Sequence, residues 1–309
     1  MRNLSPSIKA GARPSVGRWL WRNRVGFSFV LPYMLLFFLF TVLPVCIAMV
    51  LSLTDFNMMQ LPRFIGGKNY IDLFLNDTLF IKAFQNTLVI AVITGPLSYI
   101  ISFVFAWILN ELPRGVRSVG TLIFYAPTLS GNMFTIWSML FSGDANGYIN
   151  GFLMRMGFIT APLQFLKDPT YMLPILVIIV LWSSLGTSFL AFIAGIQGVD
   201  RSLYEAAAVD GITNRWQELW YITLPSMRPQ LMFGAVMSIT SSLGVGTVIT
   251  SVFGFPSYDY TLHTIATHLD DYGGMRFEMG YACAIATVLF LLMIGANLLV
   301  KKWLSKVGE

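Results

Sequence analysis

The chain has 309 residues, of which 56% are hydrophobic and only 11% are charged. A soluble domain carries charge on about 25% of its residues, so the composition excludes that class and indicates a polytopic membrane protein. The net charge of +5 does not indicate a nucleic-acid-binding protein, because the basic residues are sorted along the chain rather than clustered, and the two cysteines, Cys46 and Cys283, lack the neighbours of a disulfide framework or a metal site.

Residues 1–24 are predicted to form a cytoplasmic tail that ends in an interfacial anchor. Trp19 and Trp21 lie among arginines, a combination typical of the inner headgroup region of a bilayer. The apolar stretch that follows is too long for the hydrophobic region of a signal peptide, and no small-residue cleavage site comes after it. We therefore expect a retained first membrane span.

Six segments of the chain contain no Asp, Glu, Lys or Arg, and each exceeds the roughly 20 residues that a helix needs to cross the hydrocarbon core. Backbone groups in lipid must pair within their own segment, so helices are required. The prediction is an all-α polytopic membrane protein with six transmembrane helices. The expected spans cover about residues 26–53, 83–109, 118–141, 172–197, 230–252 and 279–300.

The distribution of Lys and Arg predicts the orientation of these spans. Fourteen of the 20 basic residues lie in the N-terminal tail, the second-to-third connection, the 200–229 loop and the tail 301–309, whereas six lie in the other connections. Because cytoplasmic segments carry the excess of basic residues, both termini and the 200–229 loop are predicted to be cytoplasmic.

The polar residues inside the predicted spans are neutral, which argues against a carrier driven by protons or sodium ions, because such carriers place an ionisable group at membrane depth. Hydroxyl and aromatic groups suit a neutral polyhydroxylated ligand. The alternative is that Ser, Thr and Gly there serve close helix packing. The candidate residues of a substrate path are Tyr125, Asn132, Trp182, Ser183, Thr240 and Ser242.

The 200–229 loop is dense in charge and is predicted to form two short helices joined by a bend. Ser202 and Glu205 have the spacing of a capping box, and Gly211 supplies a stop. Thr213 is expected to cap a second helix, with Trp216, Leu219 and Trp220 on one apolar face, ended by Pro225 and Pro229. Without further information the loop is equally an amphipathic segment lying on the bilayer.

The connection after the fifth span holds the two histidines of the chain, His263 and His268, beside Asp270 and Asp271. A metal site is conceivable there, but we favour a solvated acidic loop and assign no ligands. Residues 257–277 are expected to be a flexible outer loop with Gly273 and Gly274 as its bend.

A nucleotide-binding fingerprint is absent from the sequence, because Gly67-Lys68-Asn69 lacks the other residues of a phosphate-binding loop. No acid–base pair or nucleophile is grouped inside a span either. We therefore expect no enzymatic activity in this chain.

The strings Glu205-Ala206-Ala207, Asp210-Gly211 and Ile222-Thr223-Leu224-Pro225 resemble the EAA loop of binding-protein-dependent ABC importer permeases, and the pattern with Trp216 and Trp220 is most similar to the carbohydrate branch that imports di- and oligosaccharides. The resemblance implies a type I ABC importer permease fold over residues 25–300 in the prokaryotic plasma (inner) membrane. It implies a homologous second permease subunit, two ATPase subunits that bind ATP and Mg²⁺, and an extracytoplasmic sugar-binding protein. The residues implied to couple the permease to the ATPase are Glu205, Ala206, Ala207, Asp210 and Gly211.

The chain departs from the resemblance after the fifth span. Phe253-Gly254-Phe255-Pro256 and a longer acidic loop stand where permeases of this kind often carry a Gly-Gly-Pro turn. Our hypothesis is that the loop reaches the binding protein through Tyr272, Gly273 and Gly274. Two alternatives remain: a self-sufficient channel or secondary carrier for a neutral solute, and an ABC importer permease for a non-sugar ligand such as glycerol phosphate.

Overall fold

The structure is a computed structural model that describes residues 24–129 and 133–304. The chain divides into two compact units, residues 1–50 and 51–309, which are described separately. In the first unit, α2 (Arg24–Phe37), a π-helical turn η1 (Phe38–Val42) and the start of α3 (Leu43–Leu51) form one apolar helix with no buried residue. Trp19 and Trp21 lie outside the described residues.

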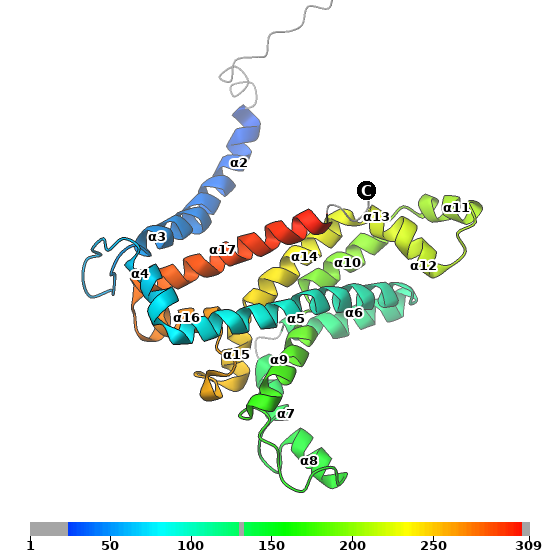
Figure 1. The fold of residues 1–309 in the computed structure, drawn as a ribbon. Helices are drawn as coiled ribbons and strands as arrows, with labels where there is room; N and C mark the ends of the chain where they lie inside the picture. Colours follow the sequence, from blue (N-terminus) through cyan, green and yellow to red (C-terminus); the bar gives the residue numbers. More distant parts are fainter. Residues whose placement is uncertain (1–23, 130–132, 305–309) are drawn as a thin grey trace, which may run out of the picture. The chain divides into compact units, whose positions relative to one another are not determined.

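In the second unit the described residues are helical, apart from connections and one isolated bridge between Thr54 and Phe64. Figure 1 shows its elements in chain order. The elements are α4 (Lys68–Ile71), η2 (Asp72–Asn76), α5 (Thr78–Asn110), α6 (Arg114–Leu129), α7 (Met133–Leu140), α8 (Tyr148–Arg155), α9 (Pro169–Ser183), α10 (Thr187–Gln197), α11 (Arg201–Val209), α12 (Arg215–Glu218), η3 (Leu219–Thr223), α13 (Leu224–Ser226), α14 (Arg228–Leu243), α15 (Gly246–Phe253), η4 (Tyr258–Tyr260), α16 (Ile265–Asp270), η5 (Asp271–Met275) and α17 (Met279–Leu304).

Helix α5 is the central element of this unit. Its 33 residues span about 50 Å at 1.5 Å per residue, and Asp77 caps its first turn by accepting a hydrogen bond from the Phe80 amide at 2.9 Å. Its buried residues recur every three or four positions and are mostly small or hydroxylated, which lets neighbouring helices approach closely. This buried stripe consists of Phe80, Ala83, Thr87, Ile90, Thr94, Gly95, Ser98, Ser102, Ala106 and Leu109.

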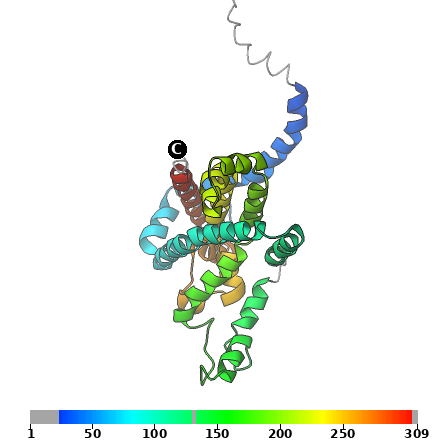
Figure 2. The same ribbon diagram turned by 90° about the vertical axis from the view of Figure 1, so that its right-hand side faces the viewer.

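Three apolar clusters hold α5 in place along its length. Near its C-terminal end, Ala106 and Leu109 pack with Phe189 and Phe192 of α10. In the middle, Ile90 packs against α9 and α15, and near its N-terminal end Phe80 packs against α14, α16 and α17. Figure 2 shows α5, in cyan, running across the second unit, with the segment that carries α8 extending away from it.

Two of the predicted spans are broken helices. Helices α9 and α10 meet at a 42° bend after Ser183, and α14 and α15 meet at a 46° bend near Gly244. The backbone freed by the first bend is compensated, because the hydroxyl of Ser102 on α5 donates to the Ser184 carbonyl at 3.0 Å.

By length and composition, the described residues contain three unbroken helices that can cross a membrane: Arg24–Leu51, Thr78–Asn110 and Met279–Trp303. The two bent pairs raise this number to five. The remaining predicted span, 118–141, includes residues outside the described ones. The fold is therefore helical and apolar as predicted, whereas the count of six spans and the cytoplasmic position of both termini stay predictions.

The contact between α10 and α14 gives a first testable prediction. A Cβ at Gly234 would overlap the ring of Phe192, so Gly234→Ala forces two packed helices apart and is expected to destabilise the protein by about 1–3 kcal/mol. The matched control is Gly115→Ala, because the space around Gly115 is open. Thermal unfolding of the detergent-solubilised protein measures both, and equal melting temperatures for the two variants would contradict the packing described here.

Candidate functional site

The 200–229 loop forms a helical hairpin, as predicted, but its first cap differs. Helix α11 begins at Arg201, and the side chain of Asp200 accepts from the Ser202 amide at 3.0 Å. The expected capping box of Ser202 and Glu205 is therefore wrong. Asp200 has extended backbone geometry and a carboxylate within reach of the first free amides, so it takes the capping position before Ser202 can.

The bend after α11 is a closed turn at Gly211. Its φ of +89° is the left-handed geometry that glycine adopts without strain. The Gly211 amide donates to the Ala208 carbonyl at 3.3 Å and the Ile212 amide to the Ala207 carbonyl at 2.9 Å, the paired bonds of a Schellman motif. The predicted stop at Gly211 is confirmed, and the turn is fixed by its own hydrogen bonds.

The second half of the hairpin begins one residue later than expected, because Asn214 caps α12 by accepting from the Trp216 amide at 3.1 Å. Of the predicted apolar face, Leu219 is buried, whereas Trp216 and Trp220 are each 66% exposed. A π-helical turn, η3, starts at Leu219 and shifts the register of the residues that follow.

The two prolines have different roles from those expected. Pro225 lies in the first turn of the short α13, and Pro229 lies in the first turn of α14, where a missing amide costs nothing. Pro229 therefore starts the next helix instead of ending the hairpin.

The two halves of the hairpin are joined by side chains. The hydroxyl of Tyr204 on α11 lies 2.8 Å from the hydroxyl of Thr223 on η3, and Thr223 donates to the Glu218 carbonyl at 3.2 Å. Glu205, Ala206, Asp210 and Gly211 are exposed on the outside of the hairpin, whereas Ala207 is 7% exposed and packs beneath it. The arrangement is a stiff projection that offers a small, mixed polar and apolar surface.

The predicted substrate-path residues gather at the two bends. Trp182 and Ser183 end α9, and Thr240 and Ser242 lie in the last turn of α14. The hydroxyls of Ser183, Thr240 and Ser242 donate to carbonyls of their own helices at 2.8–2.9 Å. Trp182 packs edge-on against Trp137 of α7, with ring centroids 6.2 Å apart.

The remaining substrate-path residues are not brought to one place. Tyr125 lies half-buried on α6, and Asn132 lies outside the described residues. Ser242 lines a groove of about 940 Å³ between α5, α14 and α17 whose other walls are mostly apolar, so its surroundings do not resemble a polar passage. Their role in binding substrate stays a prediction.

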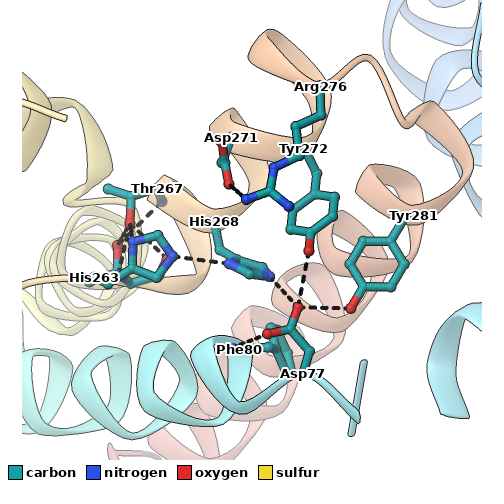
Figure 3. Close-up of polar contacts among 10 residues, drawn as sticks. Asp77, Phe80, His263, Thr267, His268, Asp271, Tyr272, Arg276 and Tyr281 are labelled. Carbon is teal, nitrogen blue, oxygen red and sulfur yellow. Dashed lines mark hydrogen bonds and ion pairs between the residues drawn. The ribbon is translucent and has the colours of Figure 1, made fainter. Parts of the chain in front are cut away.

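A buried polar network lies where α5 begins, on the loop that follows α15 (Figure 3). His263 Nε2 lies 3.0 Å from His268 Nδ1, and His268 Nε2 lies 3.1 Å from a carboxylate oxygen of Asp77. The hydroxyls of Tyr281 and Tyr272 donate to the same oxygen at 3.0 and 3.4 Å. The network joins α5, α16, η5 and α17.

The loop that holds the histidines is ordered by its own contacts. Thr264 and Thr267 form a capping box at the start of α16, and Arg276 pairs with Asp271 at 2.6 Å while lying over the Tyr272 ring. His263 and His268 are 2% and 1% exposed, so the expectation that they belong to a solvated acidic loop is wrong. Gly273 and Gly274 both lie in the η5 turn, and Tyr272, in the same turn, is half-buried.

The charge state of the network follows from burial. Burial, together with the charge of His268, lowers the pKa of His263 to about 4. Burial also lowers the pKa of His268, although the negative charge of Asp77 acts to raise it. Burial alone would raise the pKa of Asp77, but the Phe80 amide, His268 and Tyr281 outweigh it and lower that pKa. At neutral pH two neutral imidazoles therefore donate in sequence toward one carboxylate.

A polar cavity of about 770 Å³ lies beside this network. Its walls include Asp77, Tyr272 and Tyr281 of the network together with Asp55, Asp72 and Glu278. Sequence reasoning did not single out Asp77, because its partners lie almost 200 positions away; the T-x-x-T spacing of Thr264 and Thr267 could have indicated the helix that brings them there.

Known proteins resemble the chain over most of its length. The family model for "Binding-protein-dependent transport system inner membrane component" matches residues 101–305. The chain is 31% identical to the "Probable ABC transporter permease protein YesP" of Bacillus subtilis, over 88% of this chain and 87% of the relative. It is 29% identical to the "Lactose transport system permease protein LacF" of Rhizobium radiobacter, over 79% of each.

One solved structure, a bacterial alginate ABC transporter in complex with an alginate pentasaccharide-bound periplasmic protein, contains a chain that superposes with a TM-score of 0.74. The match covers 95% of this chain and 99% of that chain at 24% identity, so it shows that the folds are alike.

The buried histidines predict how stability depends on pH. Their folded-state pKa values lie below the 6.5 of an exposed histidine, so the unfolded chain binds more protons in acid. The stability contributed by the neutral pair is complete above pH 6.5 and is lost as the pH falls toward about 4. We expect the melting temperature of the purified protein to fall over this range.

The variant His263→Gln removes one of the titrating groups and keeps a hydrogen-bonding side chain. Its fall in melting temperature between about pH 7.5 and about pH 4.5 is expected to be smaller than that of the parent protein. An identical fall in both proteins would show that the acid sensitivity arises elsewhere.

Proposed function

The chain belongs to the family of binding-protein-dependent transport system inner membrane components, and on that premise we propose that it is the membrane-spanning permease subunit of an ATP-driven oligosaccharide importer. The observation that carries the proposal is the hairpin of residues 200–229. A rigid projection with a closed turn at Gly211 suits a mechanical contact with a separate motor, whereas a flexible amphipathic segment does not.

We assign the contact with the ATPase to the exposed face of the hairpin. Glu205, Ala206, Asp210 and Gly211 are the residues that we assign to contact with the ATPase; Ala207 supports them from beneath. Small side chains allow close docking, and Glu205 can accept a hydrogen bond across the contact. ATP and Mg²⁺ are bound by the partner, and catalysis belongs to it.

The complete importer in this proposal contains two ATPase subunits, a homologous second permease and an extracytoplasmic binding protein. It resides in the prokaryotic plasma (inner) membrane, multi-pass, with both termini cytoplasmic. The bacterial relatives and the periplasmic protein named for the similar structure support these assignments. Tyr272, Gly273 and Gly274 lie near the polar cavity and are our candidates for contact with the binding protein.

A sugar is the proposed substrate for two reasons. Relatives of this chain are named for lactose and for arabinooligosaccharides. The two bends carry neutral hydroxyl and aromatic groups, here Trp182, Ser183 and Thr240, which can stack on sugar rings and exchange hydrogen bonds with them. A phosphorylated ligand would call for a basic group at these bends, and a secondary carrier for an ionisable one.

The proposal is tested by affinity purification of the tagged chain from its native host, followed by uptake assays in membrane vesicles. A stable complex with an ATPase subunit is expected from the purification. The vesicles are expected to take up labelled oligosaccharides, but not glycerol phosphate, when ATP is supplied. Uptake by vesicles that contain only this chain would instead favour a self-sufficient channel or carrier.

Substitutions on the hairpin give a sharper prediction. Gly211→Asp places a side chain and a charge on the exposed turn, and Glu205→Lys reverses the charge beside it, so both are expected to abolish uptake while the protein still inserts. The matched control is Gly157→Asp, because Gly157 also has positive φ and open space around it but lies after α8. Normal uptake by both hairpin variants would remove the coupling assignment.

A further inference from the structure

Helix α5 contacts both ends of the second unit, and this arrangement suggests a mechanical role that goes beyond the proposed coupling contact. In Figure 1, α5 runs without interruption from the part of the unit that carries α16 to the part that carries α12. The hairpin is joined covalently to α10 and α14, whereas α5 contacts it through the side chain of Trp107. Those contacts can therefore be removed without breaking the chain.

The contact at the hairpin end pairs two tryptophans. The rings of Trp107 on α5 and Trp216 on α12 lie 4.9 Å apart between centroids, at an angle of 54°. Beside them, the Arg215 guanidinium lies 3.3 Å from the carboxylate of Glu111, the residue that follows α5, and 2.7 Å from the carboxylate of Glu218. Arg215 and Glu111 are 66% and 41% exposed, so their ion pair adds little, and the aromatic contact is the stronger fastening.

The contact at the opposite end is a set of hydrogen bonds between the first turns of α5 and the loop 257–278. Asn86 donates to the carbonyls of Thr261 and His263 at 3.0 and 2.9 Å, and the Thr87 hydroxyl accepts from the Ile265 amide at 2.9 Å. Asp77 adds its bonds from His268 and Tyr281. The loop therefore has to follow any shift of this end of α5.

The helix between the two contacts is supported on both sides of its single proline. Pro96 removes one backbone donor, which allows bending. Phe192 of α10 packs edge-on against Tyr99 and Phe103 on one side of it, with centroids 5.4 and 5.7 Å away, and Ile90 packs against Met172 and Ile249 on the other side. Packed interiors resist compression and transmit displacement, so α5 can act as a strut.

We propose that α5 carries movement of the hairpin to the loop 257–278, with Trp107 and Trp216 as the positioning residues at one end and Asp77 at the other. The inference rests on the proposed function, because it assigns the path by which work done on the hairpin reaches the opposite side of the protein. Trp107 and Trp216 contact neither the substrate nor, in this proposal, the nucleotide; they determine how tightly ATP hydrolysis is coupled to transport.

The test uses the full transporter complex reconstituted in vesicles with its binding protein. In a Cys46→Ser, Cys283→Ser background, Met275→Cys, at a site that is 61% exposed in the η5 turn, carries a spin label that reports on the loop. In the parent complex the label is expected to change its mobility when ATP is added. Trp107→Ala and Trp216→Ala are expected to remove that change and to lower uptake by about tenfold, while ATP hydrolysis is kept.

Four further variants separate a positioning role from general damage. Trp107→Phe and Trp216→Phe keep a ring contact and are expected to restore most of the uptake. Trp303→Ala makes the same change at an exposed position at the end of α17, away from the contact, and is expected to leave both signals unchanged. The double variant Trp107→Ala, Trp216→Ala is expected to lose no more than either single variant, because both remove one contact.

The outcomes distinguish this inference from the proposed function. If the parent label does not respond to ATP, or if the response survives in Trp107→Ala and Trp216→Ala, the role of α5 is refuted even though the complex transports sugar. If no ATPase subunit joins the complex, the proposed function itself fails before the label is measured. If the alanine variants lose ATP hydrolysis together with uptake, the tryptophans support docking of the motor and the inference is also refuted.

Discussion

The structure depends on one constraint: in a membrane, each backbone amide and carbonyl must find its partner inside the protein. Helix α5 meets it along most of its 33 residues, with Pro96 as the position that lacks an amide. It also supplies the partner where a neighbour fails, because Ser102 donates to the Ser184 carbonyl at the bend between α9 and α10. The small and hydroxylated side chains of the buried stripe on α5 allow the bend between α9 and α10 to approach α5 closely enough for this hydrogen bond. An alanine at Ser102 would fit the same space but would leave that carbonyl without its donor.

The same constraint explains where polar chemistry can be placed. An unbroken apolar helix offers substrate only side chains, whereas a bend also exposes backbone groups and gathers the residues that end each half. Trp182 and Ser183 stand at one bend and Thr240 at the other, so the breaks in the helices and the neutral polar residues coincide. The hydroxyls of Ser183 and Thr240 donate to carbonyls of their own helices, and a ligand hydroxyl can still donate to the second lone pair of each oxygen.

Local patterns in the sequence predicted the parts that depend on neighbours a few residues away. The apolar runs, the hairpin and the stop at Gly211 were predicted because periodicity and glycine geometry act over one or two turns. The caps at Asp200 and Asn214 were missed by one or two residues, since several capping side chains compete for the same amides. The burial of His263 and His268 was missed because it depends on Asp77 and Tyr281, which no local pattern connects with them.

The two attachments of α5 differ in chemistry, and the difference suits a lever. At the loop 257–278 the bonds are partly buried and directional: Asn86 donates to two backbone carbonyls, and His268 and Tyr281 donate to the Asp77 carboxylate. A small displacement breaks several of them at once, so this joint resists movement. At the hairpin, the contact is between two tilted indole rings, which has no single required hydrogen-bond direction, and a solvated ion pair that tolerates changes in distance. In our proposal, an aromatic contact without a fixed direction at the hairpin lets the hairpin change its angle while it still displaces α5, and the directional bonds at the other end pass that displacement to the loop.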